Sequence, residues 1–392
     1  MNIPPADRLA GFGAYFFAQL GQRIAALRAE GKDIIRVDIG APDMPPPDFV
    51  IEALVEEARR PDTHSYTTYG GTPEFKQAVA QFYKKRFGVE LDPASEVLAL
   101  IGSKEGLFHL SQAILNPGDV ALIPDPGYPT YRSGTLLAGA EPYFMPLLES
   151  NGFLPDLEAI PADVLARARI LWLNYPNNPT SAVAPFSFFE DVIAFAREHN
   201  ILVAHDAPYA DVTYDGYRAR SILEVPGAKD VAVEFNSHSK AFNMAGWRLG
   251  MLVGNADAVR HVHVYKSQVD TSHFQPVLKG GIVALTDDRI WDWIAQRNAI
   301  YQERRDIVVN ALRSAGIKVS PPQASLYVWY PLPEGETDSK AFCSRALEEA
   351  GVSMTPGTVF GAHGEGYVRV SLGTKTDALK EAMERLVAWL KK

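Results

Sequence analysis

Short apolar runs alternate with amphipathic stretches between about residues 46 and 285, and this pattern limits the possible folds more than any other feature of the sequence. The apolar runs are EVLALIG, DVALIPD, EPYFMPL, ARILWLNYP, NILVAHD, VAVEFNS and RLGMLVG. Stretches with a helical spacing of apolar residues, such as GTPEFKQAVAQFYKKRFG, lie between them. Strands that alternate with helices predict an α/β domain with a mostly parallel sheet.

The sequence on either side of this region has a different rhythm. A helical pattern over 14–31 and a short strand near 34–39 precede it. A long helical pattern over 287–314, the segments GIKVSPP, ASLYVWYPL and YVRVSLG, and helical patterns over 338–350 and 375–391 follow it. We therefore predict an N-terminal arm with part of a small domain (1–45), a large α/β domain (46–285) and a smaller C-terminal α+β domain (286–392).

Charge and cysteine content exclude several classes of protein. The chain has 38 basic and 47 acidic residues and a net charge of −9, which argues against the basic face of a nucleic-acid-binding protein. Its single cysteine, Cys343, excludes an internal disulfide and a cysteine-rich zinc site, and suits a reducing cytoplasm. No leader pattern or membrane-spanning apolar run is present. We expect a cytoplasmic protein without a metal, nucleic-acid or membrane partner.

Polar residues follow several of the predicted strands, at the edge of the sheet where α/β proteins bind ligands. Asp206 follows the run ILVA, where a carboxylate needs a partner, although it could equally cap the next segment. Tyr209 lies three residues further on, and alone it would more often be a core residue. Asn178 stands before a proline after ILWL, where a plain turn is the simpler interpretation.

The segments IGSKEGL and DPGYPTY follow two more predicted strands. Ser103 and Lys104 would open a helix, and the free N–H groups of a helix start bind anions, although Ser103 could be a plain N-cap. The P-loop spacing is absent. Tyr128 could lie flat on a planar ligand or could be an ordinary turn residue.

The stretch EFNSHSKAFNMAGWRLG, residues 234–250, is the richest in candidate groups. Ser237 and Ser239 offer hydroxyl groups, and Arg248 offers a planar guanidinium that suits phosphate. Lys240 could be a further phosphate contact, or an amine of lowered pKa that forms a Schiff base. Together with a stacking ring, a buried acid and a phenol, these groups are what pyridoxal phosphate requires.

Over nearly its whole length the chain resembles the fold-type I pyridoxal-phosphate aminotransferases of class I/II. SHSKAFNMAGWRLG is similar to the family's Ser-x-Ser-Lys-x-x-x-x-x-Gly-x-Arg-x-Gly block. YTTYGGTPEF, GSKEGL, DPGYPTY, YPNNPT, HDAPY and YVRVSLG occur in the family's order. The resemblance implies a three-layer α/β/α large domain with a smaller α+β domain, and pyridoxal 5'-phosphate as cofactor. His238 departs from the pattern, because the family usually has an apolar residue there.

The resemblance also implies a role for each matching residue. Lys240 would bond to the cofactor aldehyde and act as general base, and Asp206 would pair with the ring nitrogen. Tyr209 and Asn178 would bind the ring 3-oxygen, and Tyr128 would stack on the ring. The phosphate would be surrounded by Ser103, Lys104, Ser237, Ser239 and Arg248, with Tyr66 reaching the phosphate of the neighbouring subunit in a homodimer. Arg369 would clamp the substrate α-carboxylate, helped by Asn178 and the backbone at Gly40.

The implied reaction moves the amino group of an L-amino acid to a 2-oxo acid, with 2-oxoglutarate as the expected acceptor. GSKEGL, HDAPYADVTYDG and ASLYVWYPLP are most similar to the branch that holds LL-diaminopimelate aminotransferases and bacterial alanine and aspartate aminotransferases. We expect the first activity, and keep the other two and a β-lyase as alternatives. Tyr15 and Lys104 match positions that contact substrate in the first group.

Two interpretations from other classes fit less well. A ligand-sensing regulator would carry an added DNA-binding segment, whereas the helical N-terminus is short and the chain is acidic. A degenerate scaffold would not need both Lys240 and Asp206.

Overall fold

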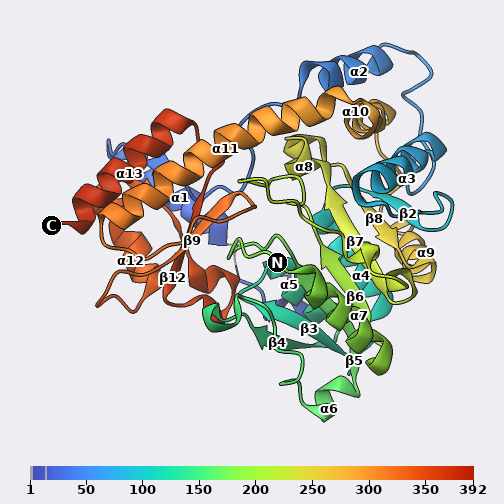
Figure 1. Ribbon diagram of the computed structural model, residues 1–392, viewed down its shortest axis with the longest axis horizontal. Helices are drawn as coiled ribbons and strands as arrows, with labels where there is room; N and C mark the ends of the chain where they lie inside the picture. The colour runs from blue at the N-terminus through green and yellow to red at the C-terminus, as the bar shows by residue number, and fades with distance from the viewer. Residues whose placement is uncertain (1–2, 14–15) are drawn as a thin grey trace.

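The computed structural model describes residues 3–13 and 16–392 (Figure 1). Its largest sheet has seven strands in the order β2-β8-β7-β6-β5-β3-β4, and they fall within the seven apolar runs of the sequence. The strands are β2 (Val97–Leu100), β3 (Val120–Asp125), β4 (Glu141–Pro146), β5 (Ala168–Asn174), β6 (Leu202–Asp206), β7 (Ala232–Ser237) and β8 (Gly250–Gly254). β8 is antiparallel to both neighbours, and the other pairs are parallel. The expected α/β fold with a mostly parallel sheet is confirmed.

Helices cover both faces of this sheet, which gives three layers (Figure 1). One face carries α4 (Ser103–Ile114), α5 (Pro129–Leu137) and α9 (Ala256–Lys266), and the other carries α2 (Asp48–Ala58), α3 (Pro73–Phe87), α7 (Phe186–His199) and α10 (Gln275–Thr286). In β2, Leu98 and Leu100 pack in the core beneath α4, α5 and α9, whereas Val97 and Ala99 pack in the core on the opposite face of the sheet. Because the inner strands are buried on both faces, most of their positions are apolar, which explains the continuous runs, whereas the edge strand β4 is largely exposed.

A smaller α+β part is built from both ends of the chain. β9 (Tyr327–Pro331), β11 (Thr355–Pro356) and β12 (Tyr367–Ser371) form an antiparallel sheet, and β1 (Ile35–Arg36) pairs in parallel with β10 (Val352–Ser353). The helices α1 (Phe16–Ala29), α12 (Ser339–Arg345) and α13 (Thr376–Leu390) belong to the same part. The strand expected near 34–39 is only two residues long, and GIKVSPP contains no strand.

Helix α11 (Arg289–Ser314) runs through both parts (Figure 1). Ile290 and Ile294 near its start lie in a core of the large part, whereas Val308 and Leu312 near its end lie in the core of the smaller part. Its 26 residues span about 39 Å at 1.5 Å per residue. One continuous helix therefore contributes apolar side chains to both cores.

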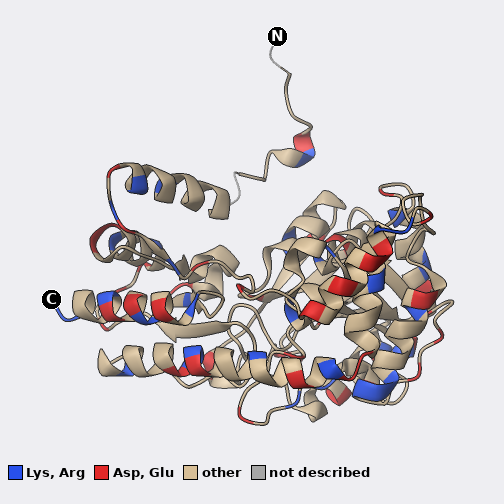
Figure 2. Cartoon of the chain, turned by 90° about the horizontal axis from the view of Figure 1, so that it is seen from above, with Lys and Arg blue, Asp and Glu red and all other residues tan. Residues whose placement is uncertain are grey.

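The start of the chain projects from one side of the molecule (Figure 2). Its short 3₁₀ turn η1 (Asp7–Leu9) comes near α5 but has no buried residue. Acidic and basic residues are interspersed over the described chain in the same view. A short helix, α6 (Ala162–Leu165), precedes β5. None of the helices within residues 3–13 and 16–392 combines the length and the apolar character needed to cross a membrane.

Gly106 lies where α4 meets the sheet, and this contact predicts a sensitivity to added volume. A Cβ there would lie 2.4 Å from Cδ1 of Leu100 and 3.0 Å from Cε1 of Phe235. Gly106→Ala should therefore lower the free energy of unfolding by about 1–3 kcal/mol in urea titrations. The matched control is Gly21→Ala in α1, where a Cβ meets nothing within 4 Å, and there we expect a gain of about 0.5–1 kcal/mol. A Gly106→Ala variant as stable as the control would contradict the close packing.

Candidate active site

A cavity of about 550 Å³ lies at the carboxyl ends of β5, β6 and β7, where the two parts of the chain meet. Twelve of the side chains and backbone positions predicted from the sequence line it: Gly40, Ser103, Lys104, Tyr128, Asn178, Asp206, Tyr209, Ser237, Ser239, Lys240, Arg248 and Arg369. Tyr66 does not line it, and Tyr15 lies outside the described residues. Gly40 and Arg369, 329 positions apart in the chain, therefore share one site.

One end of the cavity is built to attract an anion. α4 starts at Ser103, which lines this end, and the start of a helix carries a partial positive charge. Arg248 crosses the helix start so closely that a Cβ on Gly102 would lie 2.2 Å from its Nη2. Ser239 N donates to Ser237 Oγ over 3.2 Å, which orients that hydroxyl group. Guanidinium, hydroxyl groups and helix dipole together suit a phosphate.

Asp206 ends β6 and is buried. Its Oδ2 accepts a hydrogen bond of 2.7 Å from the hydroxyl of Tyr131, and its backbone carbonyl accepts one of 2.7 Å from Asn174 Nδ2. Its Oδ1 is buried without a hydrogen-bond partner among the described residues. Burial raises the pKa of Asp206 to about 6, against the effect of the Tyr131 hydrogen bond. One carboxylate oxygen is thus available for a donor on a bound ligand.

Lys240 lies in the four-residue helix α8 (His238–Ala241), directly after β7. Its Nζ donates to the carbonyl oxygen of Gly40. Burial lowers the pKa of this amine to about 8, and the nearby cations Arg369 and Arg248 add to the shift. A larger fraction of the side chain is therefore neutral near pH 7 than for an ordinary lysine, and a neutral amine is the nucleophilic form.

Arg369 approaches from β12 of the smaller part. Its Nη1 donates to Asn178 Oδ1 over 2.8 Å and its Nη2 donates to the carbonyl oxygen of Asp38 over 3.0 Å. The guanidinium carbon lies 4.1 Å from the ring centre of Tyr327 and 4.6 Å from that of Phe360. These contacts fix a planar cation at the cavity wall, in the form that binds carboxylates bidentately.

Sequence reasoning missed several residues of the cavity wall: Phe17, Arg36, Tyr327 and Phe360. Tyr327 hydrogen-bonds through its hydroxyl to that of Tyr209 over 2.8 Å. It also approaches Gly40 so closely that a Cβ there would lie 2.5 Å from its hydroxyl oxygen. The only signal for Tyr327 was its place in the apolar run of ASLYVWYPL, which indicates a strand but not which face meets the site.

Tyr66 is the one predicted residue that the described part of the chain places outside the cavity. Tyr66 is 87% exposed in the loop before α3, so its side chain lies on the surface of the molecule. Phe17, two positions after Tyr15, does reach the cavity wall, so the N-terminal segment takes part in it.

His238 is a buried departure from the usual apolar residue. Its ring is fully buried and lies between Phe75, with ring centres 5.9 Å apart, and Phe242, with ring centres 5.3 Å apart. Burial lowers its pKa to about 3. The imidazole is therefore neutral at physiological pH and packs as an aromatic ring.

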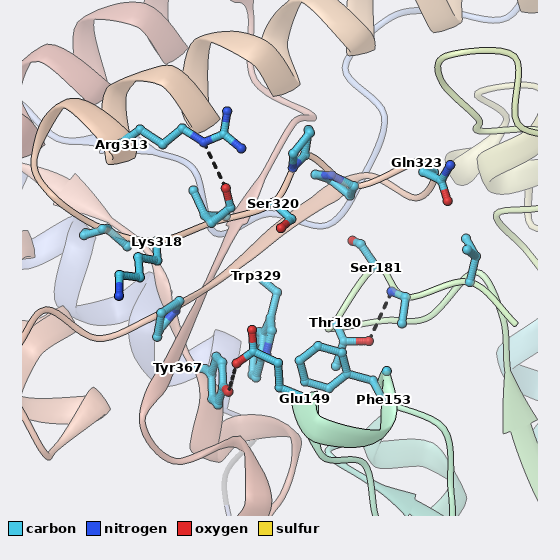
Figure 3. Close-up of a pocket in the computed structure, with 18 of the residues that line it drawn as sticks. Glu149, Phe153, Thr180, Ser181, Arg313, Lys318, Ser320, Gln323, Trp329 and Tyr367 are labelled. Atoms are coloured by element: carbon cyan, nitrogen blue, oxygen red, sulfur yellow. Dashed lines mark hydrogen bonds between the residues drawn. The ribbon is translucent and has the colours of Figure 1, made fainter.

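A second cavity, of about 670 Å³, shares no lining residue with the first (Figure 3). Glu149, Phe153, Trp329 and Tyr367 lie together on one side of it, away from Arg313 (Figure 3). The Tyr367 hydroxyl donates to Glu149 Oε2 over 3.0 Å, and its ring stacks on Trp329. None of the predicted site residues borders it, so we place the chemistry in the first cavity.

Among the described residues, Glu105, His109 and Asp270 bring possible metal-ligand atoms within 4.8 Å of one another. Nζ of the buried Lys266 donates to Glu105 Oε1 and to both carboxylate oxygens of Asp270, each over 2.8 Å. This ammonium group already bridges the two carboxylates, so we interpret the cluster as an ion network between α4 and α9.

Comparisons with known proteins show the family of this chain. A family model described as aminotransferase class I and II matches residues 32–386. This chain belongs to that family. It is 51% identical over 381 residues to the LL-diaminopimelate aminotransferase of Moorella thermoacetica, with 97% of each chain covered. It is 50% identical over 386 residues to that of Syntrophobacter fumaroxidans, covering 98% of this chain and 99% of the relative.

The solved structure of apo-BacF from Bacillus subtilis superposes on this aminotransferase with a TM-score of 0.94 at 39% identity, covering 99% of this chain and 98% of the other. The recognition of a class I/II aminotransferase from its sequence blocks is therefore confirmed.

The buried His238 predicts an acid sensitivity of this aminotransferase. An unfolded histidine takes up a proton as the pH falls through about 6.5, whereas the folded one does so only near pH 3, so folding loses stability over that range. At pH 5 the loss relative to neutral pH is about 2 kcal/mol. Replacing His238 by Leu should remove that part of the pH dependence, as measured by urea denaturation at pH 7 and pH 5.

His261→Leu, at an exposed position of α9, is the matched control and should leave the pH dependence unchanged. If His238→Leu and wild type lose equal stability between pH 7 and pH 5, His238 is not neutral in the folded protein.

Proposed function

We propose that this aminotransferase transfers an amino group from LL-diaminopimelate to 2-oxoglutarate, with pyridoxal phosphate as its cofactor, in the cytoplasm. The identity of about 50% to enzymes named LL-diaminopimelate aminotransferase, over nearly the full length of both chains, supports the donor. A lysine of lowered pKa, a buried carboxylate and an anion-binding end within one cavity carry the proposal of a transaminase site.

The chain's own groups fit the cofactor. Asp206 Oδ1 is buried and unpartnered among the described residues, which suits the N–H of a pyridinium ring. Tyr128 would stack on the ring, and Tyr209 and Asn178 would hydrogen-bond its 3-oxygen. The phosphate would be held by Ser103, Lys104, Ser237, Ser239 and Arg248. When bound, pyridoxal phosphate supplies an aldehyde that condenses with amines and a ring that accepts electrons from the bonds around the substrate Cα.

Three side chains of the cavity would bind the substrate or hold its protons. Arg369 binds the substrate α-carboxylate, because Asn178 and the carbonyl of Asp38 already fix its plane. Lys240 Nζ takes up the proton from the substrate Cα, since its lowered pKa of about 8 lies close to the working pH and leaves a larger neutral fraction than an ordinary lysine has. Asp206 stays ionised through its hydrogen bond from Tyr131 and keeps a proton on the ligand's ring nitrogen. Burial of the site strengthens each of these electrostatic terms.

The far end of the substrate would meet further cations. Lys104 and Arg36 line the cavity in addition to Arg369, and Arg36 is held by two hydrogen bonds to Asp38. Two positive groups beyond the α-carboxylate clamp favour a substrate with a second carboxylate, as in LL-diaminopimelate, 2-oxoglutarate or aspartate, over alanine. The same observation keeps an aspartate aminotransferase as the second candidate.

We also propose that the protein is a homodimer with sites at the subunit interface. Tyr66 is 87%, Val269 58% and Phe274 48% exposed, and hydrogen bonds from Thr67 to Ser272 and His273 join their segments into one surface. Exposed apolar clusters of this kind mark interfaces. Sedimentation equilibrium should give twice the chain mass of 43.1 kDa, and Tyr66→Glu should weaken the association. A monomeric wild type that is fully active would overturn this proposal.

The deciding experiment is a donor panel on the purified holoprotein, followed by absorbance and by detection of glutamate from 2-oxoglutarate. LL-diaminopimelate should convert the cofactor to its amine form and yield glutamate, whereas alanine and aspartate should react at least tenfold more slowly in kcat/KM. Lys240→Ala is the control, and it should remove both the absorbance change and turnover because no amine remains to move the proton.

A faster reaction of aspartate than of LL-diaminopimelate would assign the second candidate function. Cysteine, which has a leaving group on Cβ, is added to the panel for the last alternative: release of ammonia, pyruvate and sulfide from it without glutamate would instead identify a β-lyase. Turnover by Lys240→Ala equal to that of wild type would overturn the mechanism.

A further inference from the structure

We infer that Tyr131 is a positioning residue of this site: its hydroxyl holds one oxygen of Asp206 so that the other faces the cofactor ring and the shared proton stays on the ring nitrogen. The inference rests on the proposed cofactor. It concerns a residue that touches neither the cavity nor a substrate, since Tyr131 does not line the cavity.

Contacts with two neighbouring aromatic rings fix the orientation of the Tyr131 side chain. The side chain is fully buried and stacks on Trp172 of β5 with ring centres 5.0 Å apart and planes inclined by 16°. Tyr128 meets it edge-on, with ring centres 6.0 Å apart. The hydroxyl donates to Asp206 Oδ2 over 2.7 Å, the length of a strong hydrogen bond to a carboxylate.

The two carboxylate oxygens of Asp206 therefore have different surroundings. Oδ2 is occupied by Tyr131, whereas Oδ1 is buried with no partner among the described residues, although the carboxyl lines the cavity. Burial also keeps the pKa of the Tyr131 hydroxyl well above its usual value, so this group remains a donor at every working pH. A donor on Oδ2 favours the ionised carboxylate, which lowers its ability to take the ring proton.

Tyr131 is joined to the ring-stacking position within one helical turn. Tyr128 is the N-cap of α5, and Tyr131 N donates to its carbonyl oxygen over 3.2 Å. The start of α5 thus presents one tyrosine to the face of the proposed cofactor and a second to the acid at its edge. Displacement of this helix end would move both groups together.

The test is Tyr131→Phe, which keeps the stacked ring and removes only the hydroxyl. With cofactor labelled by ¹⁵N at the ring nitrogen, the NMR signal of the bound wild type should be that of a protonated pyridine. In Tyr131→Phe it should move toward the unprotonated value, because Asp206 becomes more basic and takes a larger share of the proton. The loss of one hydrogen bond to a charged group predicts a fall in kcat of roughly tenfold to a hundredfold.

Tyr175→Phe is the matched control. Tyr175 is also a buried tyrosine, but its hydroxyl donates to the carbonyl of Phe153 over 2.7 Å, outside the cavity. This variant reports the stability cost of losing a buried tyrosine hydroxyl and should leave the ¹⁵N signal and kcat unchanged. A ring-nitrogen signal in Tyr131→Phe equal to that of wild type would overturn the inference, even if the variant were less stable.

A cofactor analogue methylated at the ring nitrogen gives an independent arm, because its positive charge does not depend on Asp206. The ratio of wild-type to Tyr131→Phe rates should approach one with this analogue. A ratio that stays as large as with the natural cofactor would assign Tyr131 a purely structural role. Failure of wild type to bind pyridoxal phosphate would refute the proposed function itself, whereas a different preferred donor would leave the ¹⁵N comparison valid.

Discussion

The parallel register of β5, β6 and β7 is the constraint on which the site depends. Asn174 pairs with Asp206 across β5 and β6, and Asp206 pairs with Phe235 across β6 and β7, so Ser237 ends the next strand at the same edge. Because the strands are buried on both faces, a slip of one residue would exchange the side chains that face the two helical layers. The sheet core therefore fixes an amide, a carboxylate and a hydroxyl group beside one another.

The second requirement is the contact between the two parts of the chain. Arg369 from β12 donates to Asn178 of the large part. In the opposite direction, Arg297 of α11 donates to the carbonyl oxygens of Lys240 and Ala241. α8 has only four residues, so these carbonyl groups have no helical continuation and Arg297 satisfies them. Since α11 also packs into the smaller core, the backbone of the lysine is tied to both parts.

The sequence was informative where strand order alone decides position. Asp206 and Ser237 end apolar runs, and the carboxyl ends of parallel strands share one edge, so their proximity follows from the pattern. Tyr131 is as visible in DPGYPTY as Tyr128, but its contact with Asp206 depends on how α5 docks against β5, which periodicity does not specify. Tyr327 was hidden in the same way, since its partner Tyr209 is 118 residues away in the chain.

The charge of the whole molecule and that of its cavity have opposite signs. The chain carries a net charge of −9, whereas Lys104, Lys240, Arg248 and Arg369 face the cavity around the single carboxylate of Asp206. At physiological ionic strength, interactions of exposed charges, among them Lys104 and Arg248, are largely screened beyond about 8 Å, while the buried Arg369 is screened much less. An anionic substrate is therefore not guided from a distance. It is selected only after it has reached the mouth of the cavity, where attraction begins.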